Sequence, residues 1–152
     1  GRIRTPAINL ADRSIKSLWE DYFNSDSDKM MEFAYADREE ALERAIKLDK
    51  KIATDSASEG ENHHKIVSYA LRQALGGTEL VGTKEHPWLM LKEISSDGNC
   101  QTVDVLFPFF PVLYYLNPRL IASSLSPIFD NVEKGFWTKS YAIHDLGKLE
   151  SV

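Results

Sequence analysis

Five acidic and imidazole side chains in this 152-residue chain have types and spacings that suit hydrolytic chemistry. Glu93, Asp97 and Asp104 lie within twelve positions of one another, and the Asp-Gly-Asn sequence that begins at Asp97 predicts a turn between their flanks. His144 and Asp145 are adjacent in a loop that ends in glycine. Hydrolysis of an amide needs proton transfer, which carboxylates or an imidazole beside a carboxylate can supply. These five residues are therefore the candidate catalytic groups.

Each candidate also has a purely structural interpretation. Asp104 lies between two valines, and such an apolar setting would raise the pKa of its carboxyl group and suit a general acid. Alternatively, Asp104 caps the helix that follows it, and Asp97 forms an Asx-turn. Asp145 is equally suited to forming a turn, and the side chains of adjacent residues such as His144 and Asp145 point apart in an extended chain.

The remaining histidines and the single cysteine predict neither a metal site nor a cofactor. His63 and His64 diverge by about 100° on a helix, so they suit one metal ion poorly. Cys100 has no second cysteine to share a metal, and we expect it to be a buried, inert thiol. The sequence also lacks the Ser-x-x-Lys dyad and the Gly-x-Ser-x-Gly nucleophile elbow.

The composition indicates one domain with a hydrophobic core. Hydrophobic residues make up 43% of the chain, which is enough to build a core at this length. The 23 acidic residues outnumber the 18 lysines and arginines, and the net charge of −5 disfavours nucleic acid as a partner. One cysteine excludes an internal disulfide. The most apolar stretch, residues 103–116, contains two prolines and predicts no membrane span.

The elements that must position the candidates are predicted to be mainly helical. Apolar residues recur at three- and four-residue steps, which is typical of amphipathic helices. The predicted helices cover about residues 10–23, 28–54, 62–75, a segment that opens at residue 102, and 118–134. We expect a break near residues 36–37 and a bend at Pro127. Residues 78–100 are predicted to be irregular, with a short extended segment at 88–91, and the fold class is all-α with about five helices.

Aromatic residues gather in the segment that opens at residue 102. Phe107, Phe110 and Tyr114 lie three and four positions apart, so packing in a core is the simpler interpretation. With Phe109 and Tyr115 they could instead line a sugar-binding cleft. If these rings are exposed, they would form an interface for other domains or for self-association.

Four sequence strings resemble a known enzyme family. In chain order they are LRQALGGTEL (71–80), LKEISSDGNCQTVDV (91–105), YYLNPRL (114–120) and YAIHDLG (141–147). In this order and spacing they resemble the secreted glutaminases of filamentous fungi, the glutaminase A type, and their bacterial relatives. The resemblance covers residues 17–147 and fits the central helical domain of that family.

The resemblance implies a fold, an activity and a location. The implied fold is all-α and forms part of an (α/α) toroid, with short irregular or extended segments. The implied reaction is hydrolysis of L-glutamine, or a similar small amide, to L-glutamate and ammonia, by a secreted or cell-wall-associated protein. Residues 1–16 would be a lead-in with the start of the first helix, 17–147 the central helical domain, and 148–152 a divergent tail.

Family members also carry an N-terminal β-sandwich region and a further helical region, which we expect to be missing flanking domains that dock on this chain. Several functions therefore remain open. The chain could be a segment of an amidohydrolase, or a non-catalytic fragment. It could also be a carbohydrate-binding or glycosidase-like helical domain by analogy of fold, or a small acid/base ribonuclease that uses His63, His64 or His144. The arrangement of Glu93 and Asp104 around His144 in the folded chain separates these hypotheses best.

Overall fold

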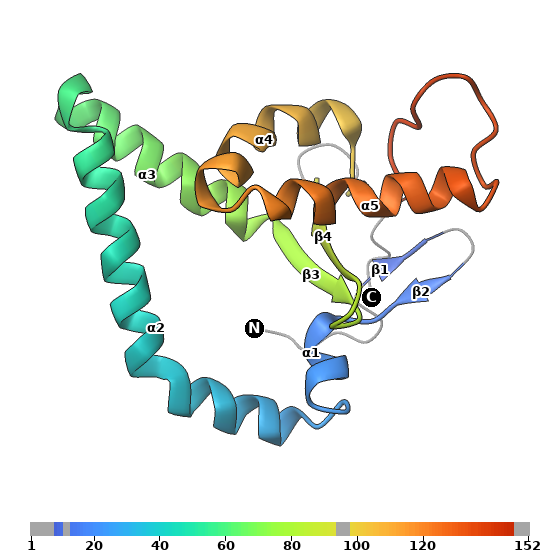
Figure 1. Ribbon diagram of the computed structural model, residues 1–152, viewed down its shortest axis with the longest axis horizontal. Coiled ribbons are helices and arrows are strands. Elements are labelled where there is room, and N and C mark those ends of the chain that lie inside the picture. Colours follow the sequence, from blue (N-terminus) through green and yellow to red (C-terminus); the bar gives the residue numbers. More distant parts are fainter. Residues whose placement is uncertain (1–7, 11–12, 94–97, 148–152) are drawn as a thin grey trace. The chain divides into compact units, whose positions relative to one another are not determined.

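The computed structural model describes residues 8–10, 13–93 and 98–147, and these residues contain five α-helices and two small antiparallel sheets (Figure 1). The elements, in chain order, are β1 (Ile8–Asn9), β2 (Ser14–Ile15), α1 (Leu18–Tyr22), α2 (Ser27–Asp55), the 3-10 helix η1 (Ala57–Glu59), α3 (Glu61–Gly76), β3 (Thr78–Gly82), β4 (Pro87–Leu91), α4 (Val103–Leu116) and α5 (Arg119–Glu133). Five helices with short extended segments confirm the predicted fold class. No helix in the described ranges is long and apolar enough to cross a membrane.

The chain divides into two compact units. One unit is formed by Asp26–Gly76, and the other is formed by the segments before and after it. The first unit, Asp26–Gly76, contains α2, η1 and α3. The second unit contains the two sheets, α1, α4 and α5, and it holds every candidate site residue that the structure describes.

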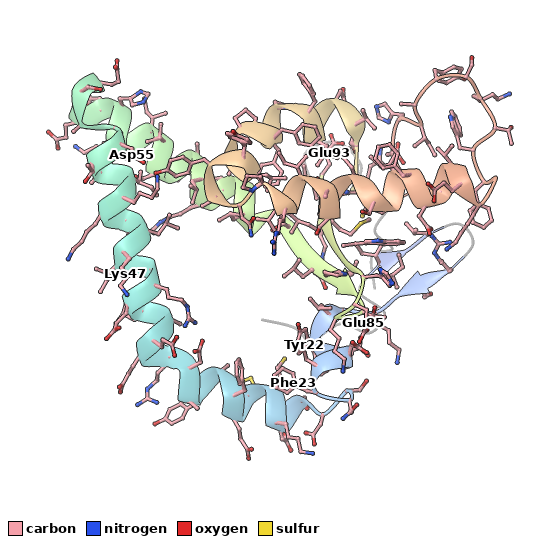
Figure 2. All side chains as sticks on the ribbon, viewed as in Figure 1. Tyr22, Phe23, Lys47, Asp55, Glu85 and Glu93 are labelled. Atoms are coloured by element: carbon pink, nitrogen blue, oxygen red, sulfur yellow. The ribbon has the colours of Figure 1, made fainter. Side chains whose placement is uncertain are left out.

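The unit formed by Asp26–Gly76 is a pair of helices joined by a tight turn. Asp26 caps α2, since its Oδ1 accepts hydrogen bonds from the backbone N–H groups of Asp28 and Lys29, both at 3.1 Å. These bonds, chiefly that of Lys29, lower the pKa of Asp26. α2 is one continuous helix through residues 36–37, so it is not broken in two there, although Figure 1 shows that its axis bends partway along. Charged side chains such as Lys47 and Asp55 project from its exposed surface (Figure 2).

The second unit is built around the hairpin of β3 and β4. These strands pair from Thr78 opposite Leu91 to Gly82 opposite Pro87. Gly82 has a φ of +90°, and a Cβ there would lie 2.7 Å from the carbonyl oxygen of His86, so the hairpin turn needs glycine. α5 packs against both β4 and α4. The buried apolar residues of this unit include Val81, Leu89, Met90, Leu106, Leu113 and Ile128.

Two predictions about the second unit were wrong. The helix predicted over residues 10–23 is only α1, because the preceding residues form the hairpin of β1 and β2, in which Ile8 pairs with Ile15 and both are buried. Residues 78–100 were predicted to be irregular, but residues 78–82 form β3. The extended segment predicted at 88–91 is confirmed as part of β4, and β3 exists because β4 completes its hydrogen bonds.

The last two helices follow the prediction closely. α4 begins directly after residue 102 and contains two prolines, and α5 begins where Asn117 Oδ1 accepts a hydrogen bond from the backbone N–H of Arg119 at 3.1 Å. The interpretation of Phe107, Phe110 and Tyr114 as core residues is wrong for Phe107 and Tyr114, which are exposed, and Phe110 is only partly buried. The buried residues of α4 are Leu106, Phe109 and Leu113. α4 turns only one face toward the core.

Candidate functional site

Two loops that are distant in sequence are joined by backbone hydrogen bonds next to the start of α4. The backbone N–H of Cys100 donates to the carbonyl of Gly147 at 2.8 Å, and the N–H of Leu146 donates to the carbonyl of Cys100 at 2.9 Å. The N–H of Val103 donates to the carbonyl of His144, also at 2.9 Å. The segment that leads into α4 therefore lies alongside the loop that contains the histidine–aspartate pair.

His144 and Asp145 form a hydrogen-bonded pair even though they are adjacent in sequence. His144 Nδ1 lies 2.7 Å from Asp145 Oδ2, and the same oxygen accepts a hydrogen bond from Asn99 Nδ2 at 3.1 Å. The other carboxylate oxygen accepts from the backbone N–H of Gly147 at 2.9 Å. Asp145 is thus both a turn former and the partner of the imidazole. Both of its oxygens are held, so the imidazole bonds to a carboxylate of fixed orientation.

Asp104 faces the other nitrogen of the imidazole from α4. Its Oδ1 lies 4.0 Å from His144 Nε2, and the side chains of His144 and Asp104 are 68% and 77% exposed. The apolar environment predicted for Asp104 is therefore wrong. The first turn of α4 directs this carboxylate to solvent and buries Leu106 instead. Asp104 is not the N-cap either, since Thr102 occupies that position.

The carboxylates around the imidazole change its proton affinity. The hydrogen bond that His144 donates to Asp145 raises the pKa of His144 above its ordinary value of about 6.5, and the negative charges of Asp145, Asp104 and Glu93 act in the same direction. The protonated imidazole therefore persists to a higher pH than in an isolated histidine. A group that titrates in this range can donate and accept protons near neutral pH.

Glu93 is the third candidate that the fold brings to this place. Its backbone N–H donates to the carbonyl of Asn99 at 2.8 Å, and its charge contributes to the raised pKa of His144. Three of the five predicted residues, Asp145, Asp104 and Glu93, therefore act on the imidazole of a fourth, His144. Asp97 lies outside the described residues. The catalytic roles of all five stay predictions.

Gln101 and Asn99 are parts of this arrangement that the sequence did not reveal. Gln101 is fully buried, with a left-handed φ of +54°. Its side chain accepts from the backbone N–H of Leu91 at 2.5 Å and donates to the carbonyls of Leu89 at 3.2 Å and Ser124 at 2.5 Å. This amide fixes the loop of Asn99 to β4 and α5. Its only signal in the sequence was its position between a predicted turn and a predicted helix.

The single thiol takes no part in this hydrogen-bonded group. Cys100 is buried, and burial raises the pKa of its thiol to about 11. A thiol with this pKa is almost entirely protonated at neutral pH and is a poor nucleophile. In the part of the chain that the structure describes, no three histidine, cysteine or acidic side chains are arranged to hold a metal ion.

Comparison with known proteins matches the chain to a family model and to two curated fungal proteins. The model described as "Glutaminase A six helical-hairpin domain" matches residues 60–149. A "Probable glutaminase" of Arthroderma benhamiae is 42% identical over 134 residues, which cover 88% of this chain and 15% of that protein. "Glutaminase A" of Aspergillus oryzae is 40% identical over 132 residues, which cover 86% of this chain and 19% of that protein. The chain thus spans less than a fifth of each relative, and no solved structure matches it significantly.

Proposed function

Because this chain belongs to the family of the glutaminase A six-helical-hairpin domain, we propose that it is a segment of an amidohydrolase that converts L-glutamine and water to L-glutamate and ammonia. The names of the two relatives support this reaction. Because the match covers most of this chain, it supports assigning the same reaction to the protein that contains the chain. A helical-hairpin domain is also consistent with a place in an (α/α) toroid, which we propose as the architecture of the longer protein.

The observation that carries the proposal is the hydrogen bond between His144 Nδ1 and Asp145 Oδ2. It directs Nε2 away from Asp145 as the nitrogen that can exchange a proton. In the proposed reaction Nε2 accepts a proton from a water molecule while the water oxygen attacks the amide carbon of glutamine. The imidazolium then gives this proton to the leaving nitrogen as the C–N bond breaks, and ammonia departs. Asp145 stabilises the imidazolium between the two steps.

The exposure of this site favours a second candidate, a segment that completes its site only with other parts of a longer protein. His144 and Asp104 are both more than two-thirds exposed. In hydrolytic enzymes the exclusion of water from the active site strengthens the electrostatic interactions that stabilise the transition state. Large apolar side chains are also exposed elsewhere, including Phe33, Tyr35, Ile66, Phe107 and Tyr114. Such side chains suit contact with further domains.

Ammonia release from L-glutamine tests both candidates. We expect the folded chain to release ammonia, and we expect His144→Ala to slow this release by about a hundredfold or more. His63→Ala is the matched control, because His63 is an exposed histidine of α3 in the other unit. Equal rates for His144→Ala and the control would reject His144 as the acid/base group. A chain that melts cooperatively but releases no ammonia would reject activity of the chain alone and favour the second candidate.

We further propose a secreted or cell-wall-associated location for the protein that contains this chain. The support is the resemblance of four sequence strings to the secreted glutaminases of filamentous fungi. Fractionation of a producing culture tests the proposal, since an antibody raised against this chain should detect the protein in the medium or the wall fraction. Detection in the cell lysate alone would contradict it.

A further inference from the structure

Asn99 is a buried residue that contacts the candidate site from a loop far away in the sequence. It is only 7% exposed, and its Nδ2 donates to Asp145 Oδ2 at 3.1 Å. The same oxygen lies 2.7 Å from His144 Nδ1, so it serves two donors, one from the amide and one from the imidazole. The amide carbonyl in this place would repel the carboxylate, so only the NH₂ end of Asn99 suits the contact.

The backbone on both sides of this contact is fixed. The carbonyl of Asn99 accepts a hydrogen bond from the N–H of Glu93 at 2.8 Å, just beyond the end of β4. The next residue, Cys100, donates to the carbonyl of Gly147 at 2.8 Å and accepts from the N–H of Leu146 at 2.9 Å. The amide of Asn99 therefore reaches Asp145 from a position that backbone hydrogen bonds define.

The carboxylate of Asp145 is held at two points. The backbone N–H of Gly147 binds Oδ1 at 2.9 Å, and Asn99 binds Oδ2. With the Gly147 bond alone, the carboxylate could rotate about its Cβ–Cγ bond and carry Oδ2 away from the imidazole. His144 depends on a fixed partner, because its side chain is 68% exposed and water competes for both ring nitrogens.

We propose that Asn99 is a positioning residue, which holds Asp145 so that the neutral imidazole of His144 keeps its proton on Nδ1 and leaves Nε2 free to accept another. The tautomer of a histidine is set by the hydrogen bond that one of its ring nitrogens makes. Donation from Asn99 also stabilises the ionised carboxylate, which is the form that accepts from Nδ1. The consequence for catalysis rests on the proposed function, whereas the tautomer is a property of the folded chain without substrate.

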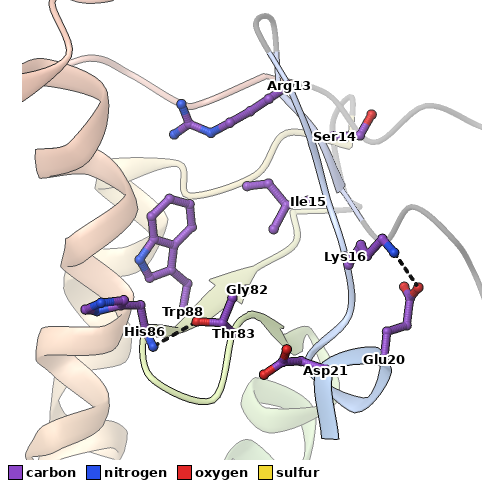
Figure 3. A pocket seen from close by; sticks show the side chains of 10 residues that line it. All are labelled: Arg13, Ser14, Ile15, Lys16, Glu20, Asp21, Gly82, Thr83, His86 and Trp88. Atoms are coloured by element: carbon purple, nitrogen blue, oxygen red, sulfur yellow. Dashed lines mark hydrogen bonds and ion pairs between the residues drawn. The ribbon is translucent and has the colours of Figure 1, made fainter. Parts of the chain in front are cut away.

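His86 is an internal reference in the same unit. It lines a cavity of about 450 Å³ that shares no lining residue with the group around His144 (Figure 3). Its backbone N–H donates to Thr83 Oγ1 at 3.2 Å, and its ring makes no hydrogen bond to any residue that the structure describes. We therefore expect His86 to divide its proton between the two ring nitrogens in every variant.

NMR spectra of the nitrogen-labelled chain at a pH above the pKa of His144 test the proposal, because the chemical shifts of the ring nitrogens distinguish the two tautomers. The signals that disappear in His144→Ala identify this residue among the four histidines. We expect the proton of the unmodified His144 on Nδ1, and a mixture of both tautomers in Asn99→Ala and in Asn99→Leu, which nearly keeps the size of the side chain. Asn62→Ala, at an exposed position of α3, should leave the tautomer unchanged.

The proposal is overturned if either variant of Asn99 melts cooperatively and keeps the proton of His144 on Nδ1. It is also overturned if the neutral His144 of the unmodified chain carries its proton on Nε2, a result that requires no variant to fold. A merely structural role of Asn99 would lower the melting temperature without changing the tautomer in the folded chain.

Ammonia release from L-glutamine is measured separately. We expect the kcat of folded Asn99→Ala to fall by about tenfold with little change in KM, because a misplaced base weakens the chemical step rather than binding. A chain that shows the expected tautomers but releases no ammonia would reject activity of the chain alone and support the positioning of His144 by Asn99. A changed tautomer with an unchanged kcat would overturn the role of Asn99 in catalysis.

Discussion

His144 Nδ1 and Asp145 Oδ2 lie 2.7 Å apart, although neighbouring side chains point apart in an extended chain. The turn that Asp145 closes onto the backbone N–H of Gly147 folds the carboxylate back toward the ring, and Asn99 holds it there from the other loop. The contact is therefore local in sequence but depends on a loop more than forty residues away. The strength of this hydrogen bond can be measured through the pKa of the imidazole.

The first prediction concerns the titration of His144. We expect its pKa, followed by NMR, to lie above about 6.5, and we expect Asp145→Asn to lower it because the largest cause of the shift is the hydrogen bond to Asp145. Asp104→Asn should lower it less, since Asp104 acts only through its charge. An equal effect of the two substitutions would contradict this order.

The same shift fixes the sign of a pH effect on stability. A histidine whose pKa is raised by folding binds its proton more tightly in the folded state. Its stabilising contribution is therefore complete below about pH 6.5 and is lost as the pH rises through the folded-state pKa. Urea unfolding of the unmodified chain and of Asp145→Asn should diverge below this range and converge above it. Divergence that grows toward high pH would contradict the assignment.

The second prediction concerns the buried amide of Gln101. Gln101→Ala leaves the N–H of Leu91 and the carbonyls of Leu89 and Ser124 without their partner, so we expect a loss of about 3 kcal/mol in the free energy of unfolding. Gln73→Ala, at an exposed position of α3, should change it by less than about 0.5 kcal/mol. Similar unfolding curves for the two variants would show that the amide is not needed.

The third prediction separates the two faces of α4. Leu113 has no exposed surface, so Leu113→Ala should lower the free energy of unfolding by about 2–5 kcal/mol through lost burial and a residual cavity. Tyr114 is its neighbour and 70% exposed, and Tyr114→Ala should cost less than about 0.5 kcal/mol. Thermal or urea unfolding of both variants tests the assignment. A large loss for Tyr114→Ala would show that its ring is covered in solution.

The fourth prediction concerns the reactivity of Cys100. With its pKa at about 11 and its sulfur buried, the thiol should react with a disulfide reagent at least about a hundredfold more slowly in the folded chain than in urea. The single cysteine makes the signal unambiguous. Rapid reaction under native conditions would mean that the loop from Asn99 to Gln101 opens readily.

Helices with a clear apolar periodicity were predicted well from the sequence. α2, α3 and α5 have apolar residues at three- and four-residue steps, and their predicted bounds lie within one or two residues of those observed. The first helix was predicted too long because the apolar residues that precede α1 are buried by pairing between β1 and β2. Periodicity alone does not distinguish apolar residues that are buried by strand pairing from apolar residues on the buried face of a helix.

By itself the sequence determined the helical fold class, the family resemblance and the presence of a carboxylate-rich segment and a histidine–aspartate pair. Only the tertiary structure decided that Asp104 lies near His144 and that the charge of Glu93 acts on it, because the backbone bonds that join residues 100–103 to the loop after Tyr141 connect positions far apart in the chain. It also decided that Asp104 faces solvent while Gln101 is buried. Residue type fixes the chemistry that a side chain can perform, whereas its burial and its neighbours depend on contacts between distant segments.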